Sequence, residues 1–191
     1  RVLLLIPNLS FGGAQRVFHD HSLLLSQHYE VFECVFNLET PQAFPSGNRV
    51  LSLEVKAGTN FFDKFYRFLQ RVRRLKHIKK QYDIDICISH LEGADLVNIL
   101  SRGREKIVSW IHGSKLFDQN ISGMLGSIRQ HFLIPFAYSS ANKVVCVSDA
   151  IRQELVTSFR ICPSRVTTIH NFFDVETIRK KSEEPLLQKF L

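Results

Sequence analysis

Two consecutive glycines, Gly12 and Gly13, stand between an apolar run and a stretch with helical spacing near the start of the chain. Glycine lets backbone amides approach a ligand closely, and a helix beginning at Ala14 would point the positive end of its dipole at the same place. This arrangement suits an anion, most often a phosphate. The alternative is a plain tight turn. Neither G-x-G-x-x-G nor G-x-x-x-x-G-K-[ST] can be written through residues 8–16, so these two nucleotide-binding fingerprints are excluded.

Four further side chains are candidates for chemistry. His112 ends an apolar stretch in Trp-Ile-His-Gly-Ser, where a histidine can position a substrate or simply fix a loop through hydrogen bonds. Gln15 and Arg16 fall in the first turn of the expected first helix. Arg16 can meet an anionic ligand or remain a solvated side chain. Glu92 follows another expected strand and can accept a hydroxyl group or cap a helix.

A basic helix is expected between Phe61 and Tyr82, with a buried stripe of Phe61, Phe65, Phe68, Leu69, Val72, Leu75, Ile78 and Tyr82. Its cations, opposed within the helix only by Asp63, are Lys64, Arg67, Arg71, Arg73, Arg74, Lys76, Lys79 and Lys80. Such a run is usually a solvated face. The excess of positive charge also predicts contact with an anionic membrane surface through Arg67, Arg71 and Arg74. Nucleic acid is not expected as a partner, because no zinc pattern, helix-turn-helix or aromatic RNP-like strand is present.

The elements that must position these residues alternate between strand and helix. The expected strands are 2–6, 30–36, 50–55, 85–89, 106–111, 143–147 and 166–169, and the expected helices are 14–25, 61–82, 94–101, 122–142 (bent near Pro135) and 149–158. This alternation predicts an α/β, Rossmann-like three-layer sandwich with a mostly parallel sheet and helices on both faces. Ligands bind at the carboxyl ends of such strands, so 8–15, 90–92, 112–115 and 148–149 should share one rim.

Composition sets the broad class of the chain. Its 191 residues allow one sizeable core, and 45% hydrophobic with 23% charged residues is typical of a soluble globular protein. The net charge of +7 implies an acidic partner. No secretory signal or membrane span is visible, which predicts a cytoplasmic location. The cysteines are expected to be thiols, the first three of them buried, and neither a metal nor a cofactor is expected; they are Cys34, Cys87, Cys146 and Cys162.

Three segments, in order, resemble glycosyltransferases of family 4, which are retaining enzymes with the two-domain GT-B fold. They are Gly-Gly-Ala-Gln-Arg-Val at 12–17, Val-Ser-Asp-Ala-Ile-Arg at 147–152 and Ile-His-Asn-Phe-Phe-Asp at 169–174. Gln15 stands where the family more often has Glu, and the chain reaches Leu191 where the nucleotide-sugar domain is expected to begin. Within the last segment, Asn171 is expected to form a turn.

The resemblance implies the N-terminal half of a GT-B fold, with an acceptor-side domain at 1–175 and the start of a linker at 176–191. It assigns His112 a catalytic place beside the transferred sugar, and Gly12 and Gly13 a place at the donor diphosphate. Gln15, Arg16 and Glu92 are then acceptor-binding residues.

The whole enzyme would move a sugar from a nucleotide-diphosphate donor to a glycan or lipid-linked acceptor of the polysaccharide or lipopolysaccharide type. Such an enzyme would act at the cytoplasmic membrane surface. Residues 1–191 alone are expected to be inactive. The rival hypothesis is a non-catalytic Rossmann-like domain that binds an anionic ligand or a partner protein.

Overall fold

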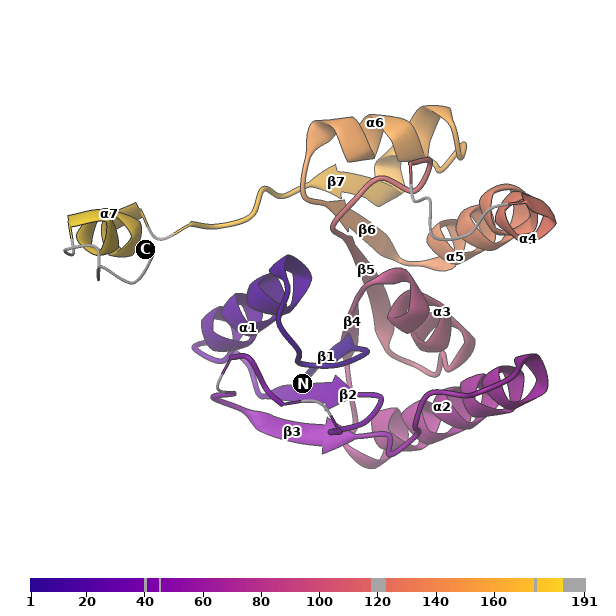
Figure 1. The fold of residues 1–191 in the computed structure, drawn as a ribbon, viewed down its shortest axis with the longest axis horizontal. Helices are drawn as coiled ribbons and strands as arrows, with labels where there is room; N and C mark the ends of the chain where they lie inside the picture. The colour runs from indigo at the N-terminus through magenta and orange to yellow at the C-terminus, as the bar shows by residue number, and fades with distance from the viewer. Residues whose placement is uncertain (40, 45, 118–122, 174, 184–191) are drawn as a thin grey trace, which may run out of the picture.

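The computed structural model describes residues 1–39, 41–44, 46–117, 123–173 and 175–183. Its centre is a seven-stranded sheet in the order β3-β2-β1-β4-β5-β6-β7, and every paired neighbour is parallel. The strands are β1 (Val2–Ile6), β2 (Val31–Val35), β3 (Arg49–Ser52), β4 (Ile86–His90), β5 (Lys106–Ile111), β6 (Lys143–Cys146) and β7 (Val166–Thr168). The predicted Rossmann-like sheet is confirmed (Figure 1).

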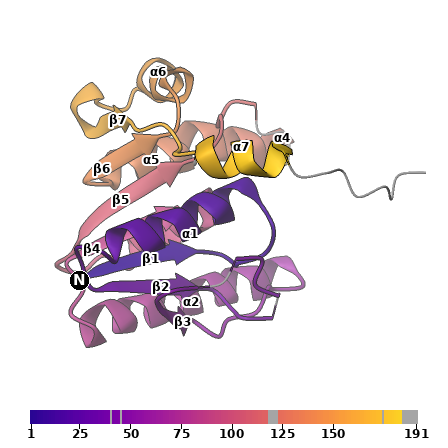
Figure 2. The same cartoon turned by 90° about the vertical axis from the view of Figure 1, so that its left-hand side faces the viewer.

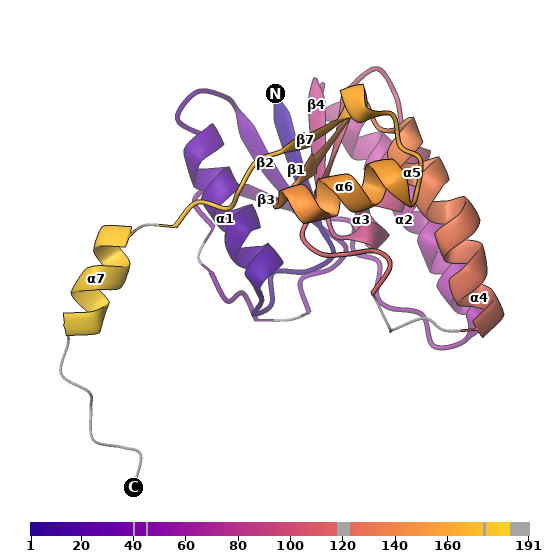
Figure 3. The same cartoon turned by 90° about the horizontal axis from the view of Figure 1, so that it is seen from above.

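The helices fill the connections between the strands. They are α1 (Gly13–Leu25), α2 (Phe61–Gln81), α3 (Glu92–Leu100), α4 (Gly123–Ile128), α5 (Ile134–Ser140), α6 (Asp149–Thr157) and α7 (Val175–Glu183). Ser148 caps the N-terminus of α6, because its side chain accepts a hydrogen bond from the Ile151 amide. Figures 1 and 3 show α7 beyond the sheet, on the side of α1, in a stretch that was expected to begin a linker.

The alternation of side chains along β1 divides the core between the two faces of the sheet. Leu3 and Leu5 pack in a cluster with residues of α2 and α3, whereas Leu4 and Ile6 pack with Phe18 of α1. A third cluster joins β5, β6 and β7 to α5 and α6. Figure 2 shows α1 in front of the sheet, and Figure 3 shows α2, α3, α5 and α6 on the opposite side.

The helix expected at 122–142 contains a π-helical turn, Arg129–Leu133, between α4 and α5. The turn ends immediately before Ile134-Pro135. A proline has no N–H and its ring crowds the preceding turn, so the wider hydrogen-bonding pattern accommodates it at the predicted bend. Residue 122 lies outside the described residues.

The predicted buried stripe of α2 is wrong at its N-terminal end. Phe68, Val72 and Ile78 pack on the core as expected, but Phe61 and Phe65 are exposed. The reason is length. A helix of 21 residues spans about 31 Å, nearly twice the length of the five-residue strands beneath it, so its first turns project beyond the sheet.

Candidate active site

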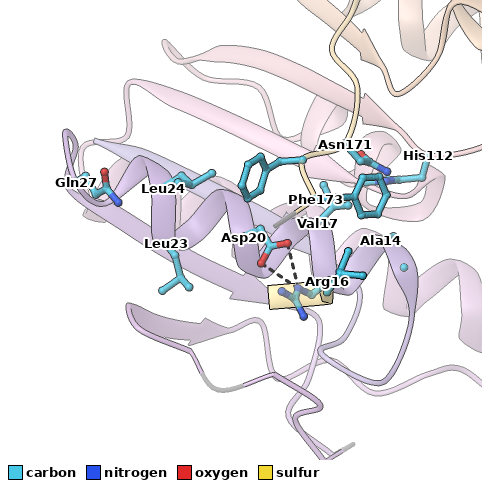
Figure 4. A pocket seen from close by; sticks show the side chains of 13 residues that line it. Ala14, Arg16, Val17, Asp20, Leu23, Leu24, Gln27, His112, Asn171 and Phe173 are labelled. Carbon is cyan, nitrogen blue, oxygen red and sulfur yellow. Dashed lines mark hydrogen bonds and ion pairs between the residues drawn. The ribbon is translucent and has the colours of Figure 1, made fainter. Parts of the chain in front are cut away.

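A cavity of about 770 Å³ lies between α1 and the segment that follows β7. Its lining residues are Gly13, Ala14, Arg16, Val17, Asp20, Leu23, Leu24, Gln27, His112, Asn171, Phe172, Phe173 and Ile178. Figure 4 shows Asn171 and Phe173 beside His112 at one end of the cavity, and Leu24 and Gln27 toward the other. The structure therefore brings together three of the predicted site residues, Gly13, Arg16 and His112.

The N-terminus of α1 forms one wall of this cavity. A side chain added at Gly13 would meet nothing within 4 Å, so its backbone faces open space. At Gly12, an added Cβ would lie 2.4 Å from the Gln15 amide oxygen. The Gln15 amide nitrogen donates to Asn8 Oδ1 at 3.2 Å, so this side chain folds back on the loop after β1. Gly12 and Gln15 support the turn and do not line the cavity.

Arg16 reaches the cavity from the first turn of α1. Its Nε donates to both carboxylate oxygens of Asp20, at 3.0 and 3.1 Å, and its guanidinium lies 5.6 Å from the centre of the Phe44 ring. Phe44 in turn stacks on Phe11, which is 89% exposed. Arg16 is therefore held by contacts within the domain while one side remains open to a ligand.

His112 follows β5 and lies on the same face of the sheet as α1. Strand residues alternate between faces, so Trp110 and His112 point to the side opposite Ile111. His90, the last residue of β4, is the register partner of Trp110, and their rings are stacked at 6.0 Å. His90 Nδ1 lies 2.9 Å from His112 Nε2. His21 of α1 completes the group, with its ring 4.1 Å from that of Trp110.

These histidines are neutral at pH 7. Burial lowers the pKa of His112 to about 4, and the charges of His21 and Lys115 act in the same direction. Burial also lowers the pKa of His21 to about 4 against the opposing charge of Asp20, and it holds the pKa of His90 well below its ordinary value. His112 therefore offers the cavity a neutral imidazole, which can donate or accept a hydrogen bond but carries no charge.

The turn after His112 is fixed from α6. The Glu154 carboxylate accepts hydrogen bonds from the amides of Lys115 and Leu116, at 2.6 and 3.3 Å, and from the Ser114 hydroxyl. A carboxylate that binds several N–H groups of one turn makes strong, charge-assisted hydrogen bonds. Gly113 in that turn has open space where a side chain would lie. The position of His112 is thus set both by its strand and by a helix on the other face.

Glu92 lies at the start of α3, where its carboxylate forms ion pairs with other side chains. Its two oxygens accept from Arg129 Nε and Nη2, each at 2.6 Å, and Lys115 Nζ lies 3.6 Å away. It does not line the cavity that contains His112. Leu91, which precedes it, has φ 74° and ψ 144°, a backbone conformation that glycine adopts far more readily than leucine. Such strain costs about 1–3 kcal/mol and tends to occur at functional sites.

The three arginines predicted to contact a membrane all have partners within the domain. Arg71 donates to the carbonyls of Val55 and Lys56, and Arg74 to those of Leu53 and Glu54. Arg67 pairs with Asp63 at 3.1 Å. The cations of α2 therefore do not form a single solvated face, and Lys79 is buried.

Two further searches cover the described part of the chain only. Within it, no group of three or more His, Cys, Asp or Glu side chains is arranged to hold a metal ion. None of the helices found there is both long and apolar enough to cross a lipid bilayer. Cys34, Cys87 and Cys146 are buried free thiols, as predicted, and Cys162 is an exposed one.

Sequence reasoning assigned no site role to four residues of this region: His21, His90, Trp110 and Asn171. The alternation of strand side chains could have found two of them, because His90 and Trp110 lie on the same face of the sheet as His112 once β4 and β5 are aligned. Asn171 was expected only to form a turn, yet it lines the cavity, and its Oδ1 is buried without a hydrogen-bond partner among the described residues.

Comparison with known proteins identifies the family of this chain. Residues 11–177 match the family model described as Glycosyltransferase Family 4. Because this match covers most of the chain, the chain belongs to glycosyltransferase family 4. No curated protein sequence is significantly similar to it.

Solved structures show the same fold at low sequence identity. The apo lipopolysaccharide outer core galactosyltransferase WaaB superposes with a TM-score of 0.67 and 16% identity, covering 91% of this chain and 46% of WaaB. HepE from Anabaena, solved with UDP and glucose, superposes with a TM-score of 0.61 and 14% identity, covering 95% of this chain and 50% of HepE. UDP-N-acetylglucosamine 2-epimerase from Rickettsia bellii superposes with a TM-score of 0.68 and 11% identity, covering 98% of this chain and 50% of the epimerase.

The chain spans about half the length of these three proteins. The described domain is therefore the N-terminal, Rossmann-like half of a GT-B fold, as predicted. The epimerase catalyses a different class of reaction, so the fold by itself does not distinguish glycosyl transfer from epimerisation. The family match is what identifies a glycosyltransferase domain.

Proposed function

We propose that this domain is the acceptor side of a retaining glycosyltransferase that moves a sugar from a nucleotide-diphosphate donor to a glycan or lipid-linked acceptor. One observation carries the proposal: the N-terminus of α1 and His112 line the same cavity at the carboxyl edge of the sheet. Parallel sheets bind ligands at this edge. The galactosyltransferase WaaB, which acts on lipopolysaccharide outer core, and HepE, which binds UDP and glucose, support this class of donor and acceptor.

In the proposed reaction the domain positions groups and stabilises charge. The α1 N-terminus directs backbone amides and the helix dipole toward the donor diphosphate, which approaches at the open backbone of Gly13. Gly12 would take part only through the turn that it forms before Gly13. His112 contacts the sugar being transferred. The leaving phosphate can accept the proton of the acceptor hydroxyl, so this route needs no protein nucleophile.

The acceptor side of the cavity is amphipathic. Leu23 and Leu24 provide apolar surface, whereas Arg16 and Asp20 provide charge. We assign Arg16 to the acceptor, since an anionic group could replace Asp20 as its partner. Gln15 and Glu92 remain acceptor-binding residues only if the closed enzyme releases them from their present partners, Asn8 and Arg129.

The domain boundaries follow from the same proposal. Residues 1–175 form the acceptor-side domain, and 176–191 begin the connection to a nucleotide-sugar half. The covered fraction of the GT-B relatives, about one half, supports this division. Because the donor would bind mainly to the other half, residues 1–191 by themselves should not transfer sugar.

A cytoplasmic membrane surface is the place we propose for this reaction. Its support comes from the projecting first turns of α2, where Phe61, Phe62 and Tyr66 are exposed close to Lys64. Aromatic rings and cations together suit the interface of an anionic leaflet. We therefore propose the membrane contact at the start of α2 instead of at Arg67, Arg71 and Arg74.

The decisive experiment replaces His112 by alanine in the enzyme that carries both halves. Removing one preorganised polar group from a catalytic site typically costs about 10²–10³ in kcat, and we expect a loss of that order. His28→Ala is the matched control, because His28 does not line the cavity. Unchanged turnover at saturating substrate in His112→Ala would remove this residue from the site.

The same assay separates the competing functions. Formation of a 2-epimer from a UDP-sugar, with no transfer to any acceptor, would favour the reaction named for the Rickettsia bellii relative. Binding of an anion without turnover of any nucleotide sugar would favour the non-catalytic Rossmann-like domain.

A further inference from the structure

The bond between His90 and His112 joins the interior of the sheet to the cavity. His90 is 0% exposed, and its Nδ1 lies 2.9 Å from His112 Nε2. The ring of His90 is surrounded by other rings: Phe18 contacts it edge to face at 5.4 Å, and Trp110 stacks on it at 6.0 Å. His90 cannot turn away without breaking this packing, so it is a fixed partner for His112.

The positions of the two protons follow from what each ring nitrogen can contact. A neutral imidazole has one N–H and one bare nitrogen, so one of the two histidines must donate and the other accept. His90 Nε2 is buried and has no hydrogen-bond partner among the described residues. If His112 donated, the proton of His90 would have to sit on this isolated Nε2. Buried N–H groups without an acceptor are rarer in proteins than buried acceptors without a donor.

We propose that His90 is a positioning residue that donates its Nδ1 proton to His112 Nε2 and thereby makes His112 present an N–H, at Nδ1, to the cavity. His112 then acts there as a neutral hydrogen-bond donor. It cannot take a proton from an acceptor hydroxyl through Nε2, because that nitrogen is already occupied. Its ligand is an oxygen that accepts a hydrogen bond, such as a sugar hydroxyl or a phosphate oxygen.

The inference rests on the proposed function only for the identity of the ligand in the cavity. The histidine pair lies within the described chain whatever the ligand is. The lowered pKa values of both residues support the neutral state that the argument needs. The charged and titratable groups that influence the pair are His21 and Lys115, and Asp20 acts on His21.

The direct test is nitrogen NMR on residues 1–191 labelled with ¹⁵N-histidine at pH 7. Long-range ¹H–¹⁵N correlations show which ring nitrogen carries the proton. We expect His112 and His90 both to be protonated at Nδ1, with the other tautomer roughly tenfold less populated, the bias expected from one unmade buried hydrogen bond. Exposed His77 serves as the reference for a ring that exchanges between tautomers.

Two outcomes of this spectrum overturn the proposal. One is a proton on Nε2 of both residues, which would mean that His112 donates to His90 Nδ1. The other is averaged shifts for His112, like those of His77, which would mean that His90 does not hold it.

Variants at His90 test the dependence itself. In His90→Asn the side-chain amide can still donate close to the former Nδ1, so the His112 tautomer should be retained. In His90→Leu the donor is lost, and the His112 shifts should become averaged. His21→Phe is the matched control, since it keeps an aromatic ring in the cluster and leaves the pair intact. A fixed His112 tautomer in folded His90→Leu would overturn the proposal; if this variant does not fold, the wild-type spectrum still decides.

Activity distinguishes this inference from the function on which it rests. If transfer by the two-half enzyme requires His112 but the proton lies on its Nε2, the positioning role fails and the function stands. If the tautomer is as proposed but His112→Ala transfers normally, the assignment of His112 to the site fails instead.

Discussion

Lys79 Nζ lies 2.8 Å from Glu105 Oε1, and both side chains are almost completely buried. The ammonium group also donates to the Asn98 carbonyl at 2.9 Å and to Asn98 Oδ1 at 2.7 Å. A cation expected on the solvated face of a basic helix thus joins α2 to α3 and to the turn before β5.

Breaking this pair should be strongly destabilising. Lys79→Met keeps most of the aliphatic stem but leaves the Glu105 carboxylate buried without its partner, which costs about 3–5 kcal/mol in the free energy of unfolding. Adding Glu105→Leu should recover most of the loss, because the unpaired charge is then gone. Urea denaturation of the single and double variants measures both steps. A double variant less stable than Lys79→Met would refute this account.

Acid should destabilise the domain through its buried histidines. The pKa of His21 and of His112 is about 4 in the folded state, against 6.5 without burial. Between these values the unfolded chain binds protons that the folded chain does not. The free energy of unfolding therefore falls as the pH falls from 6.5 to 4, by about 1.4 kcal/mol per pH unit for each histidine.

Asp95 acts in the opposite sense. Burial raises its pKa to about 7, against the hydrogen bond from Ser89. From pH 3.8 to 7 the folded state holds the extra proton, so this residue lowers stability as the pH rises. Asp95→Asn removes that contribution, which in the wild type partly offsets the effect of the histidines. The free energy of unfolding of the Asp95→Asn variant should therefore fall more steeply on acidification than that of the wild type. Urea titrations from pH 4 to 8 compare the two slopes; equal slopes would contradict the raised pKa.

At Leu91 the strained backbone should make a glycine variant more stable than an alanine variant, which is the reverse of the usual order. Both Leu91→Ala and Leu91→Gly lose the same side-chain packing, but only glycine relaxes the positive φ. We expect the glycine variant to be more stable than the alanine variant, by about 1 kcal/mol. At Leu100 of the same helix, alanine should be the more stable by a similar amount. Thermal unfolding measures all four variants, and an alanine advantage at both positions would show that Leu91 is unstrained.

The proposed membrane contact is tested by two triple variants with the same change of charge. Lys64, Arg73 and Lys76 are exposed, whereas Arg67, Arg71 and Arg74 have partners in the domain. Replacement of the exposed set by glutamine should weaken binding to anionic vesicles, because each cation contributes about 1 kcal/mol near such a surface. Replacement of the partnered set should leave this binding nearly unchanged but lower the melting temperature.

Salt and lipid charge supply the control for this comparison. Binding should weaken steeply with ionic strength, since exposed charges are screened beyond roughly 10 Å at 0.1 M. Equal co-sedimentation of the wild type and both variants with anionic vesicles at low salt would leave α2 as a solvated face.

The fold could be predicted because each of its signals is local. The run 2–6 is apolar without alternation, and the glycines at 12 and 13 mark a turn into a helix. The exposure of Phe61 and Phe65 could not be predicted in this way. It depends on how far α2 extends relative to strands that lie elsewhere in the sequence, which the periodicity of the helix does not contain.

The site was predictable only in part, for a similar reason. His112 stood out at the end of a strand, whereas the importance of His90 appears only once β4 and β5 are in register. Likewise, Glu92 and Arg71 are occupied by partners 37 and 15–16 residues away in the sequence. A single sequence identifies which side chains can act, but pairing between distant elements decides which of them are available.

One wall of the cavity belongs to the sheet through α1, and the other is a segment that leaves the sheet after β7. Asn171, Phe173 and Ile178 come after the contacts that hold this segment to the end of β6, which join the Ile169 amide to the Cys146 carbonyl and His170 Nδ1 to the Val147 carbonyl. A ligand that contacts both walls is expected to hold this segment, and α7 with it, in one orientation relative to α1.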